Sequence, residues 1–500
     1  MKIGGLDIGT TGCKLTVFDE NGKFLGRAYR DYPVRRGADA HTLDASALMD
    51  GVYGVIREMA SQVPDLGGFG VTSFGETFVL TDEKGIPLED CMLDTDKRGS
   101  EECHELEERL GSRHIAEIAG IRPHEMYSLP KLMWVKKHQP DLYARAAHAF
   151  LIEDYVVFML TGVAQIDYSL ATRTMAFDIR KLDWSDEIFG AAGIDRHLFS
   201  KPVPTGTPAG PVNAETMAKT GLSGKTVVVS ISHDQIAAAV GAGVFDAGTA
   251  VDGAGTVECL TPVYAGVPPM EPMYDGNYAV VPYVVPGTYV TYAFSYTGGA
   301  LIQWFTETLA GREKSLAEAE GISVNEYLER QYAESRGQDT PSGLLVLPHF
   351  AGAATPYMDT GSRGVIAGLT AASTAADIYR GCLEGVVYEM CLNVEHLEKS
   401  GLQYHRIRAT GGGAKSALWM QMKADMLNVP VEALRTPDAG TVGSAMLTGA
   451  ALGYFGNLQE AAEQMVEVRR TFEPRLEMHE KYRKIYERYR ELYEAVRPLM

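Results

Sequence analysis

Two glycine-rich turns constrain the fold of this chain more than any other feature of its sequence. The first lies in residues 5–12 (GLDIGTTG), between apolar segments that favour β-strands. Gly9 and Gly12 permit the backbone angles of a tight turn and place no side chain over the loop. The N–H groups of the loop and the hydroxyls of Thr10 and Thr11 can therefore face an anion such as phosphate. Taken alone, the segment also fits an ordinary glycine hairpin.

The second turn follows about 245 residues later, where residues 250–257 (AVDGAGTV) repeat the order apolar, Asp, small residues, Gly255, Thr256, apolar. A repeat at half the chain length predicts two related halves, each opening with a phosphate-facing turn. Two unrelated hairpins are the alternative. The pairing resembles the actin-like ATPases, which include sugar kinases, actin and large heat-shock chaperones. The resemblance implies an α/β fold of two actin-like (ribonuclease H-like) domains, residues 1–245 and 246–500, with a ligand cleft between them.

Length and charge narrow the class of ligand. A chain of 500 residues is long enough for two large domains that each bury a core. A net charge of −19 argues against nucleic-acid and membrane-surface partners, because the average field repels phosphate backbones and anionic lipid. A small phosphorylated ligand must then meet a local site built from loops, together with a divalent metal.

Cysteine usage and the chain ends predict a cytoplasmic protein. The six cysteines contain no CxxC pair and no zinc spacing, so we expect reduced thiols. The first residues lead into a strand without the features of a signal peptide. No run approaches 18 apolar residues, so we expect no transmembrane segment. A homodimer is compatible with the sequence.

The first half alternates helix and strand, and one acidic residue stands where a strand ends. Residues 44–59 have apolar positions at helical spacing, and residues 69–74 return as a strand. Ligands in such sheets collect at strand ends, so Glu76 is placed to meet a polar substrate. A solvated turn residue is the alternative for Glu76.

A second polar cluster follows at residues 93–98. Asp94 and Asp96 accept hydrogen bonds and Arg98 donates them, a combination that can bind vicinal hydroxyls. The same residues can instead cap and pair with the helix predicted at 101–110. A metal site is disfavoured because no third ligand stands at a fixed spacing.

The apolar strand predicted at residues 226–233 stops at Asp234 and Gln235, where a helix of small residues begins. An aspartate in this position is either the N-cap of the helix or a catalytic base. The residues alone do not decide between the two.

Three successive glycines, Gly411, Gly412 and Gly413, precede another predicted helix. They allow a flat ligand to approach the backbone, and the helix N-terminus favours an anion. A plain strand-to-helix turn is the alternative. Near the C-terminus, tyrosines at four- and three-residue spacing predict a helix that packs an aromatic stripe on the second half, namely Tyr482, Tyr486, Tyr489 and Tyr493.

Residues 126–138 (MYSLPKLMWVKKH) fit, position by position, the first signature of the FGGY carbohydrate kinases. Residues 364–384 are similar to the second signature, although Gly381 and Cys382 depart from its usual residues. The resemblance covers nearly the whole chain. The family contains xylulose, ribulose, glycerol, gluconate, rhamnulose and fuculose kinases.

The resemblance implies transfer of the γ-phosphoryl group of ATP to a hydroxyl of a ketose or polyol, with domains that close around the substrates. Asp234 is then the general base, and Asp7 helps to organise Mg²⁺. The sugar-binding residues implied by the family are Glu76, Asp96, Arg98 and Gln235. The residues implied to bind ATP are Thr10, Thr11, Lys14, Gly255, Thr256, Gly411, Gly412 and Gly413. His233 replaces a glycine that is frequent in the family, and its role is open.

The sugar is harder to assign than the reaction. Glycerol kinases share Glu76, but they carry an arginine in place of Gly75 and an aromatic residue in place of Met126, which argues against glycerol. Xylulose kinases share the Asp96-x-Arg98 pattern, yet their Met-His pair is replaced at Gly75 and Glu76. We expect a ketopentose such as xylulose. A nucleotide-dependent switch without a sugar substrate is the second hypothesis.

Overall fold

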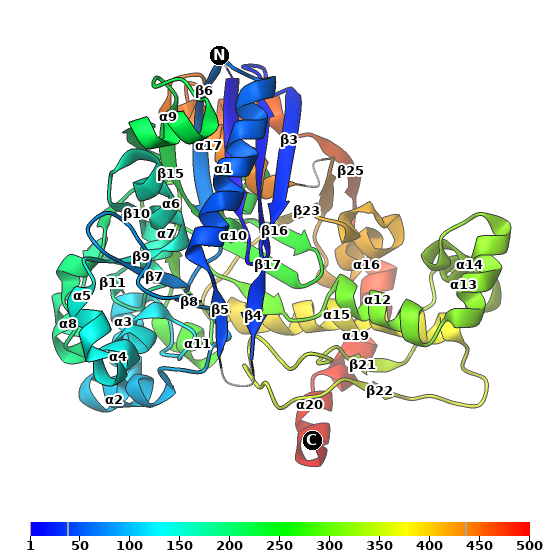
Figure 1. Cartoon of the computed structure of the whole chain (residues 1–500). Coiled ribbons are helices and arrows are strands. Elements are labelled where there is room, and N and C mark those ends of the chain that lie inside the picture. Colours follow the sequence, from blue (N-terminus) through cyan, green and yellow to red (C-terminus); the bar gives the residue numbers. More distant parts are fainter. Residues whose placement is uncertain (1, 38–39, 436–437) are drawn as a thin grey trace.

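The architecture was obtained as a computed structural model, which describes residues 2–37, 40–435 and 438–500. Two mixed sheets form its centre, one from each half of the chain (Figure 1). The first sheet has the strand order β14 (Thr207–Pro211), β15 (Val227–His233), β6 (Leu66–Ser73), β1 (Lys2–Ile8), β2 (Gly12–Phe18) and β3 (Phe24–Asp31). The second has the order β18 (Val281–Pro282), β19 (Tyr289–Val290), β17 (Glu258–Tyr264), β16 (Thr249–Ala254), β23 (Arg406–Thr410), β24 (Val431–Leu434) and β25 (Val468–Phe472), with β20 (Ala293–Ser295) also paired to β17.

Five strands of the first sheet have counterparts of the same relative direction in the second sheet. The hairpin β1–β2 corresponds to β16–β17, and both are antiparallel. The strands β6 and β15 continue the first sheet in parallel, as β23 and β24 continue the second. An antiparallel strand, β14 or β25, closes each sheet. The internal repeat predicted from the two turns is therefore present as a repeated topology.

Helices cover both faces of the first sheet. The helix α1 (Ala45–Gln62), whose N-cap Asp44 accepts hydrogen bonds from the backbone N–H groups of Ser46 and Ala47, packs on β2 and β3. On the other face lies α17 (Ala439–Ala451), which comes from the second half of the chain (Figure 1). Ser444 Oγ donates to the carbonyl of Gly70 at 3.2 Å, so α17 also bonds to a strand of the first half.

The helix α10 (Asp234–Gly241) crosses α17 in close contact, which small residues make possible. A Cβ atom at Gly241 would lie 1.9 Å from the Ala439 carbonyl oxygen, and one at Gly443 would lie 1.9 Å from the Ala237 carbonyl oxygen. A Cβ at Gly5 in β1 would lie 2.2 Å from the Thr441 carbonyl oxygen. The backbones of α10, α17 and β1 are thus in direct contact.

The remaining elements surround these sheets. In the first half they are β4 (Val34–Arg36), β5 (His41–Leu43), β7 (Phe78–Thr81), β8 (Cys91–Met92), α2 (Ser100–Leu110), α3 (Ser112–Ala119), α4 (Ser128–His138), α5 (Pro140–Arg145), β9 (His148–Leu151), α6 (Ile152–Thr161), β10 (Gln165–Asp167), α7 (Tyr168–Thr172), β11 (Phe177–Asp178), β12 (Asp183–Trp184), α8 (Asp186–Ala192), β13 (Lys201–Val203) and α9 (Ala214–Thr220). In the second half they are α11 (Met270–Asp275), α12 (Gly299–Thr308), α13 (Gly311–Glu320), α14 (Val324–Arg336), β21 (Leu345–Leu347), β22 (Val365–Ala367), α15 (Ala375–Glu398), α16 (Ala417–Leu427), α18 (Leu458–Met465), α19 (Leu476–Tyr489) and α20 (Leu492–Val496).

The six cysteines are free thiols, as predicted from their spacing. Within the described ranges, no helix has both the length and the apolar character needed to cross a bilayer.

The close contact between α10 and α17 generates a stability prediction. We expect Gly443→Ala to lower the free energy of unfolding by at least about 2 kcal/mol, because the added methyl must push the two helix backbones apart. Gly190→Ala in α8 is the control, since nothing lies within 4 Å of its added Cβ. The control should be neutral or stabilising by up to about 1 kcal/mol in urea unfolding. Equal stability of the Gly443 variant and the wild type would contradict a backbone contact.

Candidate active site

Asp234 lies at the junction of β15 and α10. His233 occupies the N-cap position of α10 without a side-chain capping bond, and Asp234 is the first helical residue. The N-cap alternative for Asp234 is therefore wrong. Its side chain is 37% exposed, and its Oδ1 lies 3.3 Å from Nε2 of His233. A carboxylate held in this way is available to a ligand.

Burial shifts the pKa values of both residues at this junction. Burial raises the pKa of Asp234 to about 6, with a hydrogen bond from the Gln235 backbone opposing the shift. Burial and the nearby guanidinium of Arg173 lower the pKa of His233 to about 3, so its imidazole is neutral near pH 7. Asp234 thus has no cationic histidine beside it, and its own pKa suits a general base.

Glu76 lies in a buried ion pair. It follows β6 in the left-handed region with φ 66° and is 8% exposed. Its Oε1 accepts from Nε of Arg173 at 2.5 Å and also contacts Nη2 of Arg173. The rings of Tyr127 and Tyr292 flank this guanidinium, with centroids 5.1 and 5.8 Å from its Cζ. The solvated-turn alternative for Glu76 is therefore wrong.

Arg173, the partner of Glu76, was not among the site residues predicted from the sequence. It follows the short helix α7, and only the folded chain brings it within reach of Glu76, 97 residues earlier. Asp167 caps α7 by accepting from the backbone N–H groups of Ser169 and Leu170, and Ser169 Oγ accepts from the His233 backbone N–H at 2.9 Å. The segment around α7 thus positions Arg173 and the residue before Asp234 together.

Asp96 and Arg98 form a third polar group. Nε and Nη2 of Arg98 donate to Asp96 at 2.9 and 2.7 Å, and the His41 backbone N–H donates at 3.0 Å. Burial opposes ionisation, but these hydrogen bonds hold the pKa of Asp96 below its ordinary value. The helix α2 takes Gly99 as its N-cap, so Asp96 does not cap it. The two residues pair with each other, with Arg98 over the Trp134 ring at 5.3 Å.

The first glycine turn carries a charged triad beside it. Lys14 Nζ lies 3.0 Å from Asp7 Oδ2 and 3.0 Å from Asp438 Oδ1. Burial raises the pKa of Asp7 to about 6, with Lys14 opposing the shift and the nearby Asp234 adding to it. Thr10 and Thr11 form the turn between β1 and β2. The ends of β1 and β15 both pair with Ser73 at the end of β6, which brings the first turn and Asp234 to the same edge of the first sheet.

The metal expectation for Asp7 can be tested on its surroundings. Two carboxylates, from Asp7 and Asp438, converge on one point, which Lys14 Nζ occupies. The described residues contain no group of three or more potential metal ligands. Two carboxylates are the type and number of protein ligands that Mg²⁺ commonly uses, with phosphates and water as its other ligands. Here Lys14 Nζ holds the point between them, so Mg²⁺ would bind beside this lysine rather than in its place.

The second glycine turn and the glycine run line one cavity of about 700 Å³. Gly255 and Thr256 from the turn, and Gly412 and Gly413 from the run, are among the residues that line it. Gly411 does not line the cavity; its φ is 90°, and an added Cβ would be 2.7 Å from the Ala254 carbonyl oxygen. The glycine run is a strand-to-helix turn, and it also borders a space of ligand size.

A buried triad of charged residues lies next to this cavity, because Lys423 contacts the ring of Trp419, which lines it. Lys423 Nζ on α16 lies 2.6 Å from Asp252 Oδ2 and also contacts Glu258 Oε1, and all three side chains are almost fully buried. Asp252 occupies the position in β16 that Asp7 occupies in β1. The triad ties the helix after the glycine run to the second turn. No pattern in the sequence indicated Lys423 as the partner of these two carboxylates.

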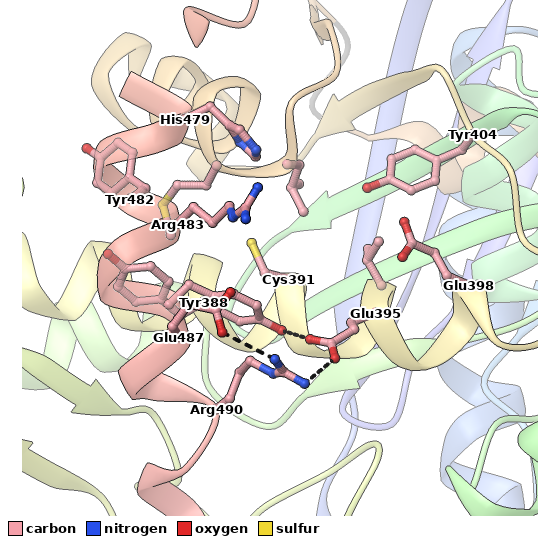
Figure 2. A pocket seen from close by; sticks show the side chains of 14 residues that line it. Tyr388, Cys391, Glu395, Glu398, Tyr404, His479, Tyr482, Arg483, Glu487 and Arg490 are labelled. Atoms are coloured by element: carbon pink, nitrogen blue, oxygen red, sulfur yellow. Dashed lines mark hydrogen bonds and ion pairs between the residues drawn. The ribbon is translucent and has the colours of Figure 1, made fainter. Parts of the chain in front are cut away.

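The C-terminal tyrosines lie in a separate place. The predicted stripe packs on α15, where the Tyr388 ring lies 5.3 Å from that of Tyr489, but the helix breaks between α19 and α20 before Tyr493. Figure 2 shows Tyr388 and Tyr482 beside a pocket in which Arg490 lies between Glu395 and Glu487. The tyrosines are thus part of the packing of the second half.

The repeated topology, the two glycine turns and the cavity between turn and glycine run define a two-domain protein with the actin-like ATPase fold. Family models for the N-terminal and C-terminal domains of the FGGY family of carbohydrate kinases match residues 2–241 and 256–452. The chain belongs to this family, and it is an ATP-dependent carbohydrate kinase.

Individual relatives are similar along their whole length. A xylulose kinase of Bacillus subtilis (strain 168) is 28% identical over 486 residues, covering 96% of this chain and 94% of the relative. A glycerol kinase of Bordetella parapertussis is 30% identical over 494 residues, covering 94% and 92%. The crystal structure of a xyloylose kinase from Brucella ovis superposes with a TM-score of 0.88 at 25% identity, covering 100% of both chains.

The cavity beside the glycine run generates a binding prediction. We expect Gly412→Val to weaken ATP binding at least about tenfold while sugar binding is retained, because the side chain enters the space next to the run. An added Cβ at Gly412 meets no protein atom within 4 Å, so the fold should tolerate it.

Gly311→Val is the matched control, since its Cβ also meets nothing within 4 Å and the residue does not line the cavity. Isothermal titration calorimetry with ATP measures both variants. Unchanged ATP affinity in Gly412→Val would remove the adenosine assignment of the glycine run.

Proposed function

We propose that this kinase transfers the γ-phosphoryl group of ATP to a hydroxyl of a ketose, with a ketopentose such as xylulose preferred, and that Asp234 is the general base. The observation that carries the proposal is the location of Asp234. Its half-exposed carboxylate has a raised pKa and lies close to Asp7 beside the first turn. A base at this point can meet a sugar hydroxyl on one side and the transferring phosphoryl group on the other.

The sugar hydroxyl oxygen attacks the γ-phosphorus, the bond from that phosphorus to the bridging oxygen breaks, and ADP leaves with the electron pair. Asp234 accepts the hydroxyl proton, and Glu76, Asp96, Arg98 and Gln235 bind and orient the sugar. Phosphoryl transfer requires positioning and charge neutralisation more than covalent chemistry.

The nucleotide side of the proposal uses the two turns. Thr10, Thr11 and Lys14 on the first turn, and Gly255 and Thr256 on the second, hold the phosphates. The glycine run from Gly411 to Gly413 lines the adenosine. Mg²⁺ near Asp7, when bound, neutralises charge on the phosphates.

We divide the chain near residue 245, between the segments that the two family models match, residues 2–241 and 256–452. The helix α17 of the second half nevertheless packs on the first sheet. We place the reaction in the cytoplasm, because all six cysteines are free thiols.

The acceptor is identified by measuring ADP release over a panel of pentuloses, hexuloses, polyols and gluconate. We expect the largest kcat/KM with a ketopentose, because one curated relative is a xylulose kinase. Glycerol is included among the polyols because a glycerol kinase is 30% identical to this chain, although Gly75 and Met126 argue against it. ATP turnover that no member of the panel increases would favour a nucleotide-dependent switch.

The role of Asp234 generates a kinetic prediction. Asp234→Asn keeps the shape of the side chain but cannot accept a proton, so kcat should fall at least about 10²-fold. Dissociation constants for sugar and ATP should change only a few-fold. Asp246→Asn, an exposed change beyond the end of α10, is the control and should leave kcat unchanged. A folded Asp234 variant with near-normal turnover would end the catalytic assignment.

The raised pKa of Asp234 also predicts the pH dependence. The base works only when deprotonated, so kcat/KM should be constant above about pH 7 and fall as the pH drops through about 6. Asp7 titrates in the same range, because burial raises its pKa to about 6 as well. The Asp7→Asn variant removes the contribution of Asp7. Any fall of kcat/KM below about pH 7 that this variant still shows is therefore due to the protonation of Asp234. A rate independent of pH down to about 5 would contradict the proposed base.

A further inference from the structure

We propose that Arg173 binds the sugar directly and that Glu76 is a positioning residue that holds Arg173, so that the site selects an uncharged sugar over a sugar acid. This inference rests on the proposed function, because it concerns the acceptor side of the same site. It changes the role of Glu76 from a sugar ligand to the partner of one.

The guanidinium of Arg173 has one donor to spare. Its Nε and Nη2 are used by the Glu76 carboxylate. Arg173 is only 7% exposed, and its Nη1 is buried without a hydrogen-bond partner among the described residues. A buried donor left unpaired is costly, and the cost is larger for a charged group. An oxygen of a bound sugar would supply the missing acceptor.

The location of Arg173 suits this role. Arg173 and His233, the residue before the proposed base, both contact Tyr292: the Arg173 guanidinium lies over its ring, and the His233 ring lies 5.4 Å from it. The backbone at Gly75 leaves the space that Arg173 fills, since a Cβ there would lie 3.0 Å from Arg173 Cγ and 3.2 Å from His233 Cδ2. The rings of Tyr127 and Tyr292 confine the guanidinium. The donor is therefore held in place before a ligand arrives.

Glu76 holds Arg173 through one of its two carboxylate oxygens. Both contacts of the guanidinium fall on Oε1, and the side chain is buried. The turn that carries Glu76 is fixed by a hydrogen bond from Ser128 Oγ to the Glu76 carbonyl oxygen at 2.6 Å. The effect of Glu76 on the sugar should therefore pass through Arg173.

The charges of the site favour a neutral acceptor. The carboxylate of Glu76 already neutralises Arg173, and Asp96 likewise neutralises Arg98. Lys131 is fully buried, and its Nζ donates to the backbone carbonyls of Asp94 and Glu125. None of these three cations is left to pair with the carboxylate of a sugar acid, which would also approach the negative Asp234. The spare Nη1 donor of Arg173 suits a hydroxyl or carbonyl oxygen.

The test is a double-mutant cycle with Arg173→Lys and Glu76→Gln, measured with xylulose as the acceptor. Lysine can keep the ion pair with Glu76, but a single ammonium cannot also occupy the place of Nη1. We expect Arg173→Lys to raise the KM for xylulose at least about tenfold, with the KM for ATP within about twofold. The double variant should be no worse than the worse single variant, because Glu76 acts through Arg173.

Arg336→Lys is the matched control, because Nε and Nη2 of Arg336 also pair with one carboxylate, that of Asp377. Its KM for xylulose should not change. Thermal unfolding of each variant confirms that the fold is retained, and Glu76→Gln/Arg173→Met, which leaves no buried charge unpaired, replaces any single variant that does not fold. That variant should show the same loss for xylulose with ATP binding intact.

Three outcomes would overturn the inference alone, with xylulose phosphorylation by the wild type intact. They are an unchanged KM for xylulose in Arg173→Lys, losses that multiply in the double variant, and a higher wild-type kcat/KM for gluconate than for xylulose. A wild type that phosphorylates no sugar in the panel would instead overturn the proposed function, and this inference with it.

Discussion

The contact between α10 and α17 is the constraint on which the rest of the structure depends. Glycines at 241 and 443 let the two backbones meet, and Gly5 brings β1 against α17. The two helices run in opposite directions at the contact, because Gly241 at the end of α10 meets Ala439 at the start of α17, while Ala237 meets Gly443. Asp438, directly before α17, pairs with Lys14, which also pairs with Asp7. Asp234, the first residue of α10, follows the end of β15, which lies at the same edge of the first sheet as the end of β1.

Around this contact, each charged group of the site is held by an opposite charge. Lys14 lies between Asp7 and Asp438, Arg173 holds Glu76, and Arg98 holds Asp96. The second half contains a similar arrangement, in which Lys423 lies between Asp252 and Glu258 near the second turn. Buried pairs of this kind add little net stability, but removing one partner is strongly destabilising. Their value here is positional, because they fix the groups that face the ligands before those ligands bind. Asp234 is the exception, since its Oδ1 has no hydrogen-bond partner among the described residues.

The fold and the kinase class could be predicted from the sequence, but the contacts within the site could not. The duplicated turns indicated the two halves, because a turn followed by a strand is formed by consecutive residues and can be recognised in a single sequence. The family signatures indicated the kinase class. The partners of the site residues could not be predicted in the same way. Arg173 lies 97 residues from Glu76, and Asp438 lies more than 400 residues from Lys14, so only the folded chain brings them together. The N-cap question at Asp234 also needed the backbone, because the choice between His233 and Asp234 depends on one residue of register.

We propose that the two halves bind ATP and the sugar at one point, so that the phosphoryl group goes to the sugar rather than to water. The most direct measurement is the amount of sugar phosphate formed per ADP released, with the product counted by ³¹P nuclear magnetic resonance at saturating ATP and acceptor. The account predicts one sugar phosphate for each ADP, and ADP release that is slow without the acceptor. ADP release that proceeds equally fast without an acceptor, and yields inorganic phosphate, would contradict it.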